Sequence, residues 1–354
     1  MSATHHTATD DPAMDDTAIE VLGLAPRDLG TSATERDRRR AVRRTLLILV
    51  ALCVGFAAAY LLWDVKGSWS YALDLRTRQL AALVVVGAAV GVSSLVFQTI
   101  AGSRILTPGV MGFDSLYVLI QTVIVSALGP TALQLMGVPQ RFILNTALLA
   151  GFGLLLFRWL FRGHSRNLFV LVLVGIVVGS LFTSLATFAS RMLSPDDYLT
   201  LQSVLFASFT TVDLQLLLVT TIVAVVGLGA LVPLMRRLDV VDLGKDAATG
   251  LGLDYHRIVT ISLVVVTVLV ATSTALVGPM LFLGLLVANL ARQIVPTHRH
   301  TVLLPVAGAV GVLATVGGQF LVTHVFHLNT TLSVVVNLVG GLYFLYLLLK
   351  AVRL

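Results

Sequence analysis

Long apolar runs separated by short polar breaks dominate the chain. A helix needs about 20 consecutive apolar residues to cross the hydrocarbon core of a bilayer. Ten runs reach or approach this length, at residues 45–63, 80–101, 112–129, 142–161, 168–189, 212–235, 258–277, 280–294, 301–322 and 332–352. The pattern predicts an all-α polytopic membrane protein with about ten transmembrane helices.

The eighth run is the shortest of the ten. Only Gly278 and Pro279 separate it from the seventh run, and its apolar stretch barely reaches the length of a span. A broken or partly inserted helix is therefore an alternative to a full crossing at this point.

Composition and charge support a membrane protein. Of the 354 residues, 57% are hydrophobic and only 12% are charged, whereas a soluble domain carries about a quarter charged residues. If the chain starts inside, most of its 24 lysines and arginines fall on the cytoplasmic side, as the positive-inside rule requires. The five on the outer side are Lys66, Arg76, Arg78, Arg141 and Arg191. We therefore expect both termini to be cytoplasmic.

The first 35 residues differ from the rest of the chain. Residues 1–35 have no sustained apolar period and an acidic start, so we expect a disordered cytoplasmic tail and no secretory signal. Residues 36–354 form the predicted transmembrane domain, which opens with an arginine cluster directly before the first run. The single cysteine, Cys53, excludes an intramolecular disulfide.

The segment around the second run carries the most specific pattern. Gly87 and Gly91 lie one turn apart on one helix face, so a neighbouring helix can approach closely. The segment continues through Gln98, Pro108 and Gly112. It resembles the FecCD-type permease pattern, in which L-R-x-P-R precedes G-A-A-L-A-x-x-G-x-x-x-Q and then N-P-L-A-x-P-x-x-L-G. The resemblance implies a fold like that of the vitamin B12 importer permease, and places these five residues in helix packing and the translocation path.

The same resemblance assigns a docking role to two arginines. Arg76 matches the first arginine of L-R-x-P-R, which in the family contacts an extracytoplasmic binding protein. Gln79 replaces the second arginine, while Arg78 is shifted by one position. We expect Arg76 and Arg78 to dock the binding protein.

A loop at residues 238–257 resembles the coupling loop of ABC importers. Its helix would fit a groove of a partner ATPase, with small residues allowing close approach and glycines ending the helix. The assigned coupling residues are Asp246, Ala247, Ala248, Gly250 and Gly252. An ordinary solvated loop is the alternative.

The C-terminal third resembles the same family, with departures. The run 277–292 follows the family's G-P-I-x-F-x-G-L-x-x-P-H-x-A-R pattern, but Ala288 and Asn289 replace Pro-His. Together with Asn329, Thr330 and Thr331, this looks like the iron-chelate subgroup, whose permeases work as unlike pairs. The resemblance thus implies a heterodimer with a second FecCD-type permease rather than a homodimer.

The reading implied by the resemblance is a permease subunit of an ATP-driven importer in a bacterial inner membrane. The substrate would be an iron chelate, a ferric siderophore by our interpretation, with haem or cobalamin as alternatives; the sequence does not name the chelate. No G-x-x-x-x-G-K-[ST] motif occurs, so we expect no enzyme activity and no bound cofactor in this chain. Two ABC ATPase subunits would hold ATP and Mg²⁺, and we expect no catalytic residue, no nucleic acid partner and no metal site in this chain.

An ion-coupled secondary transporter is the rival from another class. It would need an ionisable residue within the membrane, and only Asp114 and Asp213 come near, at span starts where helix capping is an equal explanation. His298 and His300 are interpreted as solvated loop residues rather than metal ligands, because Arg299 lies between them. Polar residues within apolar runs could bond neighbouring helices or line the path: Gln98, Asn145, Asn289 and Asn337.

Overall fold

The computed structural model describes residues 31–63, 69–129, 136–162, 168–205, 209, 212–326 and 330–352. Every regular element in these ranges is a helix, which confirms the all-α fold class. The chain divides into two compact units, residues 1–44 and 45–354. In the first unit the described residues, 31–44, form the start of helix α2. The expected tail lies outside the described residues except for 31–35.

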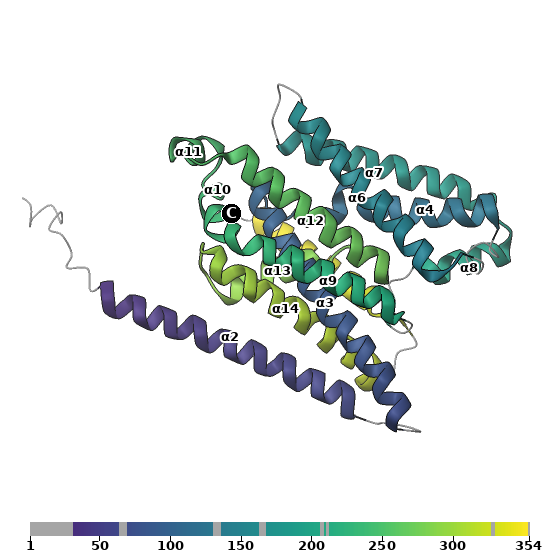
Figure 1. The fold of residues 1–354 in the computed structure, drawn as a ribbon, viewed down its shortest axis with the longest axis horizontal. Helices are drawn as coiled ribbons and strands as arrows, with labels where there is room; N and C mark the ends of the chain where they lie inside the picture. The colour runs from purple at the N-terminus through teal and green to yellow at the C-terminus, as the bar shows by residue number, and fades with distance from the viewer. Residues whose placement is uncertain are drawn as a thin grey trace, which may run out of the picture. The chain divides into compact units, whose positions relative to one another are not determined.

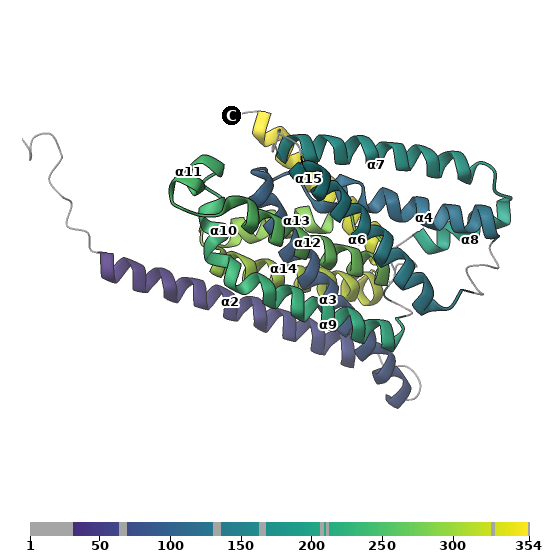
Figure 2. The same cartoon turned by 45° about the horizontal axis from the view of Figure 1, so that its top comes forward.

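The predicted spans correspond to helices of the structure (Figures 1 and 2). Among the residues that the structure describes, seven helices are long and apolar enough to cross a membrane. They are α2 (Thr31–Leu62), α3 (Trp69–Ala101), α6 (Val138–Arg162), α7 (Leu168–Ser190), α9 (Leu214–Leu231), α12 (Tyr255–Val277) and α14 (His300–Phe320). Three shorter apolar helices fall at the other predicted spans: α4 (Phe113–Leu128), α13 (Leu283–Ile294) and α15 (Leu332–Val352).

The remaining elements are short and join these helices. They are α8 (Pro195–Leu205), α10 (Met235–Val241), α11 (Lys245–Gly250), the 3-10 helices η1 (Pro108–Met111) and η2 (Val232–Leu234), and the π-helix η3 (Leu321–Val325). The sequence did not predict α8, because Asp196 and Asp197 open it and its apolar content is modest. Helix α13 has 12 residues, which reach only about 18 Å at 1.5 Å per residue. The eighth run is therefore a partial helix preceded by a non-helical segment.

Helix α3 packs along α14 at the centre of the larger unit, in contact also with α12, α13 and α9. Gly87 and Gly91 make this packing close. A Cβ on Gly87 would lie 2.6 Å from the carbonyl oxygen of Gly311, and one on Gly91 would lie 2.6 Å from that of Ala307. Both glycines therefore make contacts within the chain, and their lack of a side chain allows the backbones of α3 and α14 to approach closely.

A pair of alanine substitutions tests this packing. Gly91→Ala places a methyl group against backbone that cannot swing away, so we expect it to destabilise the protein by about 1–3 kcal/mol. Gly55 on α2 has no atom within 4 Å of its added Cβ. Gly55→Ala should therefore be neutral or slightly stabilising, since alanine is the better helix former. Thermal unfolding of the purified variants in detergent measures the difference, and equal unfolding temperatures would rule out the packing role of Gly91.

Helices α4, α6, α7 and α8 form a second group beside the helices that pack around α3. Contacts between α12 and α6 connect the two groups (Figures 1 and 2). Gly112 has a φ of 97°, and a Cβ on it would lie 3.1 Å from the Cα of Gly179 on α7. Leu201 of α8 packs on Ile120 and Ile124 of α4. This group holds η1 and the start of α4 against the central helices.

Candidate functional site

The short helix α11 (Lys245–Gly250) lies at one end of the bundle, between two glycines with positive φ. Gly244 has a φ of 95° and Gly252 a φ of 79°, conformations that favour glycine, so the chain turns sharply before and after the helix. The following helix, α12, is capped by Asp254, whose Oδ1 accepts a hydrogen bond from the backbone N–H of Arg257 at 3.2 Å. We call this end of the molecule the α11 end.

The two alanines of α11 face in different directions. Ala248 is fully buried against the protein, whereas Ala247 is exposed. Leu243 and Leu251, which flank the helix, are 64% and 68% exposed. Apolar side chains this open at a helical corner leave a small surface suited to a partner. Ala248 holds α11 in place, and Ala247 belongs to the surface that a partner could reach.

A buried polar network lies directly beneath this corner. His300, the first residue of α14, is 0% exposed. Its backbone N–H donates to Oδ1 of Asp239 on α10 at 2.6 Å, and its Nδ1 lies 2.7 Å from the same oxygen. Its Nε2 lies 2.8 Å from Oγ1 of Thr99 on α3, which also accepts from Arg292 of α13 at 3.2 Å. His300 thus joins α14 to α10 and α3, and Thr99 connects α13 to the same network.

The interpretation of His300 as a solvated loop residue is wrong. Arg299 and His298 are exposed, but the chain turns into α14 at His300 and buries the ring. Asp239 is 61 residues away in sequence, so no local pattern could have revealed the partner. His298 is exposed, as interpreted.

Two of the buried amides fix the loop that follows α3. The Nδ2 of Asn289 and the Nε2 of Gln98 each donate to the carbonyl oxygen of Arg104 at 2.9 Å. Pro108 is buried in the first turn of η1, which directly follows this loop. Gln98 and Asn289 therefore bond the backbone of one segment. Of the two roles that the sequence left open for them, bonding to neighbouring elements is the one that these contacts show.

The opposite end of α3, which we call the Arg78 end, carries two adjoining cavities. One of about 790 Å³ is lined by Tyr71, Asp74, Arg78 and Arg141 among others. One of about 270 Å³ is lined by Tyr117, Gln121, Asn145 and also Arg141. Gln121 donates to Asn145 at 3.1 Å, so the second cavity has a polar wall. The volume of the larger cavity is in the range of small-molecule sites.

The two arginines assigned to docking lie at this end in different settings. Arg76 donates from Nη1 to the carbonyl oxygens of Tyr60, Leu61 and Trp63, and so closes the C-terminal end of α2. Arg78 pairs with Asp74 at 2.6 Å on the cavity wall. Arg78 is thus the arginine that faces the cavity.

The two aspartates at span starts also differ. Asp213 caps α9, because its Oδ1 accepts from the backbone N–H of Gln215 and Leu216 at 2.8 and 3.2 Å. Asp114 does not cap α4, since Gly112 is the N-cap residue and no side chain caps it. Helix capping therefore explains the position of Asp213, whereas it does not explain that of Asp114.

Comparison with known proteins defines the class first. The fold matches a solved metal-chelate type ABC transporter in an inward-facing conformation, with a TM-score of 0.76, 21% identity, and coverage of 87% of this chain and 99% of that one. The FecCD transport family matches residues 41–350. The chain belongs to this family. It is therefore a multi-pass protein of a bacterial membrane.

Three curated relatives refine this placement. The petrobactin import system permease protein YclO of Bacillus subtilis is 42% identical, over 88% of this chain and 98% of that protein. FatC, a petrobactin import system permease protein of Bacillus anthracis, is 32% identical over 94% and 96%. FatD, a second permease protein of the petrobactin import system in the same organism, is 25% identical over 69% and 72%.

Proposed function

We propose that this chain is the membrane-spanning permease of an ATP-driven importer for an iron chelate, a ferric siderophore of the petrobactin type. The observation that carries the proposal is the 42% identity to YclO across nearly the whole of both chains. A haem or cobalamin importer is less well supported, because the vitamin B12 permease BtuC of Vibrio parahaemolyticus is 28% identical. The chain itself would bind no cofactor.

The α11 end supports ATP coupling by partner subunits. Its exposed surface combines the apolar Leu243, Ala247 and Leu251 with the polar Lys245, Asp246 and Thr249, and it stands between two glycine turns, as a rigid docking element would. Two ABC ATPases with ATP and Mg²⁺ would bind there. This end would face the cytoplasm together with both termini, because arginines 36, 38, 39, 40, 43 and 44 precede the first span.

The Arg78 end supports substrate entry from the outer side. The larger cavity presents Arg78 and Arg141, which would attract an anionic ferric chelate and the acidic rim of a binding protein. Asp74, which pairs with Arg78, and Asp213 also line this cavity, so the attraction would be local to each arginine and not a net positive charge of the lining. Because Arg76 holds the end of α2, its effect on docking would act through that helix as well as through charge.

We also propose that the functional unit pairs this chain with a second, different FecCD-type permease. FatC and FatD of Bacillus anthracis both carry the name of one import system, and this chain is more similar to FatC than to FatD. The present chain would then supply the FatC-like half of an unlike pair.

Co-expression tests the pairing and the substrate together. In a Bacillus strain lacking its own petrobactin permeases, we expect radiolabelled ferric petrobactin uptake only when this chain and a FatD-like permease are both present. The chain alone should give background uptake and no stable homodimer on purification. Full uptake by the chain alone would contradict the heterodimer, and uptake of haem or cobalamin instead would contradict the substrate class.

A further inference from the structure

A small cavity lies inside the bundle, away from both ends. Helices α3 and α12 form two of its walls, and the start of η1 at residues 107–109, the non-helical residues 278–280 and the starts of α4 and α13 complete the lining. Its volume is about 30 Å³, enough for one ion with a water molecule, since each water-sized sphere takes about 10–15 Å³. The cavity is far too small for an iron chelate in this conformation.

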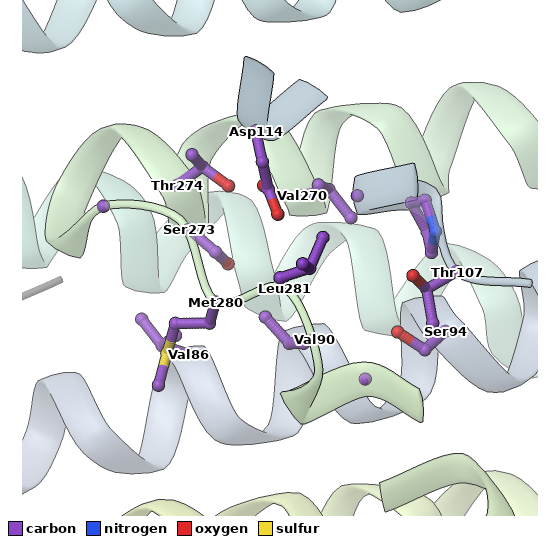
Figure 3. Close-up of a pocket in the computed structure, with 14 residues that line it drawn as sticks. Val86, Val90, Ser94, Thr107, Asp114, Val270, Ser273, Thr274, Met280 and Leu281 are labelled. Atoms are coloured by element: carbon purple, nitrogen blue, oxygen red, sulfur yellow. The ribbon is translucent and has the colours of Figure 1, made fainter. Parts of the chain in front are cut away.

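Asp114 points into this cavity from the start of α4 (Figure 3). Hydroxyl-bearing side chains lie on both sides of the carboxylate: Ser273 and Thr274 of α12 on one side, and Thr107 with Ser94 of α3 on the other. The lining contains no lysine, arginine or histidine. Oxygen is thus the only polar element that the lining side chains present.

Three of these oxygens have no partner. Oδ2 of Asp114, Oγ1 of Thr107 and Oγ of Ser273 are buried and make no hydrogen bond among the described residues. Thr107 is 3% exposed and Ser273 is 2% exposed. Buried polar atoms are normally paired, and leaving one unpaired costs about 1–3 kcal/mol. Their convergence on one cavity indicates a ligand that all three could share.

The chemistry of the site selects the ligand. Carboxylate, hydroxyl and backbone carbonyl oxygens are the ligands of hard cations, and broken helices within transporters supply such carbonyls. A divalent ion at a single carboxylate would keep several waters, for which a cavity of about 30 Å³ has no room, and Asp114 is the single charge in this lining. One negative charge balances one monovalent ion.

We infer that the cavity at Asp114 is a binding site for one Na⁺ ion, held by the Asp114 carboxylate with the hydroxyls of Ser273 and Thr107. The ion neutralises a carboxylate that would otherwise be unpaired within the membrane, where such a charge is costly. The ion would also bridge residues 107–109 and 278–280 of the lining, and so fix the start of α4 relative to the segment before α13. This role is separate from energy supply and does not depend on the identity of the transported chelate.

Equilibrium binding of radioactive sodium to the purified full-length protein tests the site. In a choline chloride background of constant ionic strength, we expect saturable binding of about one Na⁺ per chain. Asp114→Asn should weaken it at least about tenfold, because the neutral amide removes the charge that offsets the ion. Asp213→Asn is the matched control, since Asp213 caps α9 outside the cavity, and its sodium binding should equal that of the wild type.

Ser273→Ala keeps the test decisive if Asp114→Asn fails to fold. This variant removes one oxygen and adds no bulk, so it should fold and bind Na⁺ several-fold more weakly. Absence of saturable binding in the wild type, or unchanged binding in Asp114→Asn or in Ser273→Ala, would overturn the proposal. Displacement of the labelled ion by micromolar Mg²⁺ or Ca²⁺ would overturn the monovalent assignment.

Discussion

Replacing Ala247 with tryptophan is expected to reduce ATP-driven uptake at least about tenfold while leaving the permease itself folded. Ala247 is exposed on α11 between Leu243 and Leu251, so a large side chain there can extend into solvent, where it would fill the space that a docked ATPase needs. Overfilling a close contact costs about 1–3 kcal/mol, and 1.4 kcal/mol corresponds to a factor of ten in affinity. Pull-down of the ATPase and an uptake assay measure the loss.

Ala248 provides the control for this substitution. Its side chain is fully buried, so Ala248→Trp should lower the unfolding temperature of the permease even without partners. We therefore expect a stable but uncoupled Ala247→Trp and an unstable Ala248→Trp. Normal ATPase association and transport in Ala247→Trp would show that α11 is not the docking helix.

Removal of the His300 ring is expected to give the largest loss of stability among the polar residues at the α11 end. His300→Ala would remove the ring contacts to Asp239 and Thr99, which keep only the backbone N–H of residue 300 and the Arg292 side chain, respectively, from this network; we expect a cost of about 1–3 kcal/mol. Because α10 leads into α11, loosening Asp239 should also displace the docking surface. We expect a lower unfolding temperature together with reduced coupling of ATP hydrolysis to uptake.

Two further variants separate this network from general damage. His298→Ala changes an exposed histidine two residues away and should leave both stability and uptake unchanged. Asp239→Asn keeps an oxygen that can accept from His300 and should lose less stability than Asp239→Ala. If His300→Ala unfolded at the wild-type temperature, the network would have no structural role.

The membrane helices were predictable because the hydrocarbon core sets their length. All ten apolar runs appear as helices, and even the short eighth run was recognisable from Gly278 and Pro279. The helix at 245–250 was predictable for a local reason too, since Asp246, Ala247, Ala248 and Gly252 follow an arrangement that resembles a coupling helix. Helix α8 was missed because an amphipathic segment between spans has no such length requirement.

Contacts between distant residues were not predictable from one sequence. Asp114 and Asp213 both stand at the start of an apolar run, and the pattern gives them one role. The structure separates them, because Gly112, with its φ of 97°, takes the capping position and leaves Asp114 facing the cavity. His300 likewise sits in a polar stretch, and only the packing of α10, α14 and α3 shows that it is buried.

ATP hydrolysis by a reconstituted complex tests the central claim most directly. The complex contains this chain, a FatD-like permease, the cognate ATPase and the siderophore-binding protein in proteoliposomes. We predict that ferric petrobactin, delivered by the binding protein from one side of the membrane, stimulates hydrolysis several-fold and accumulates on the opposite side, where the ATPase lies. Hydrolysis that is unchanged by the ferric siderophore, with no accumulation, would contradict the account.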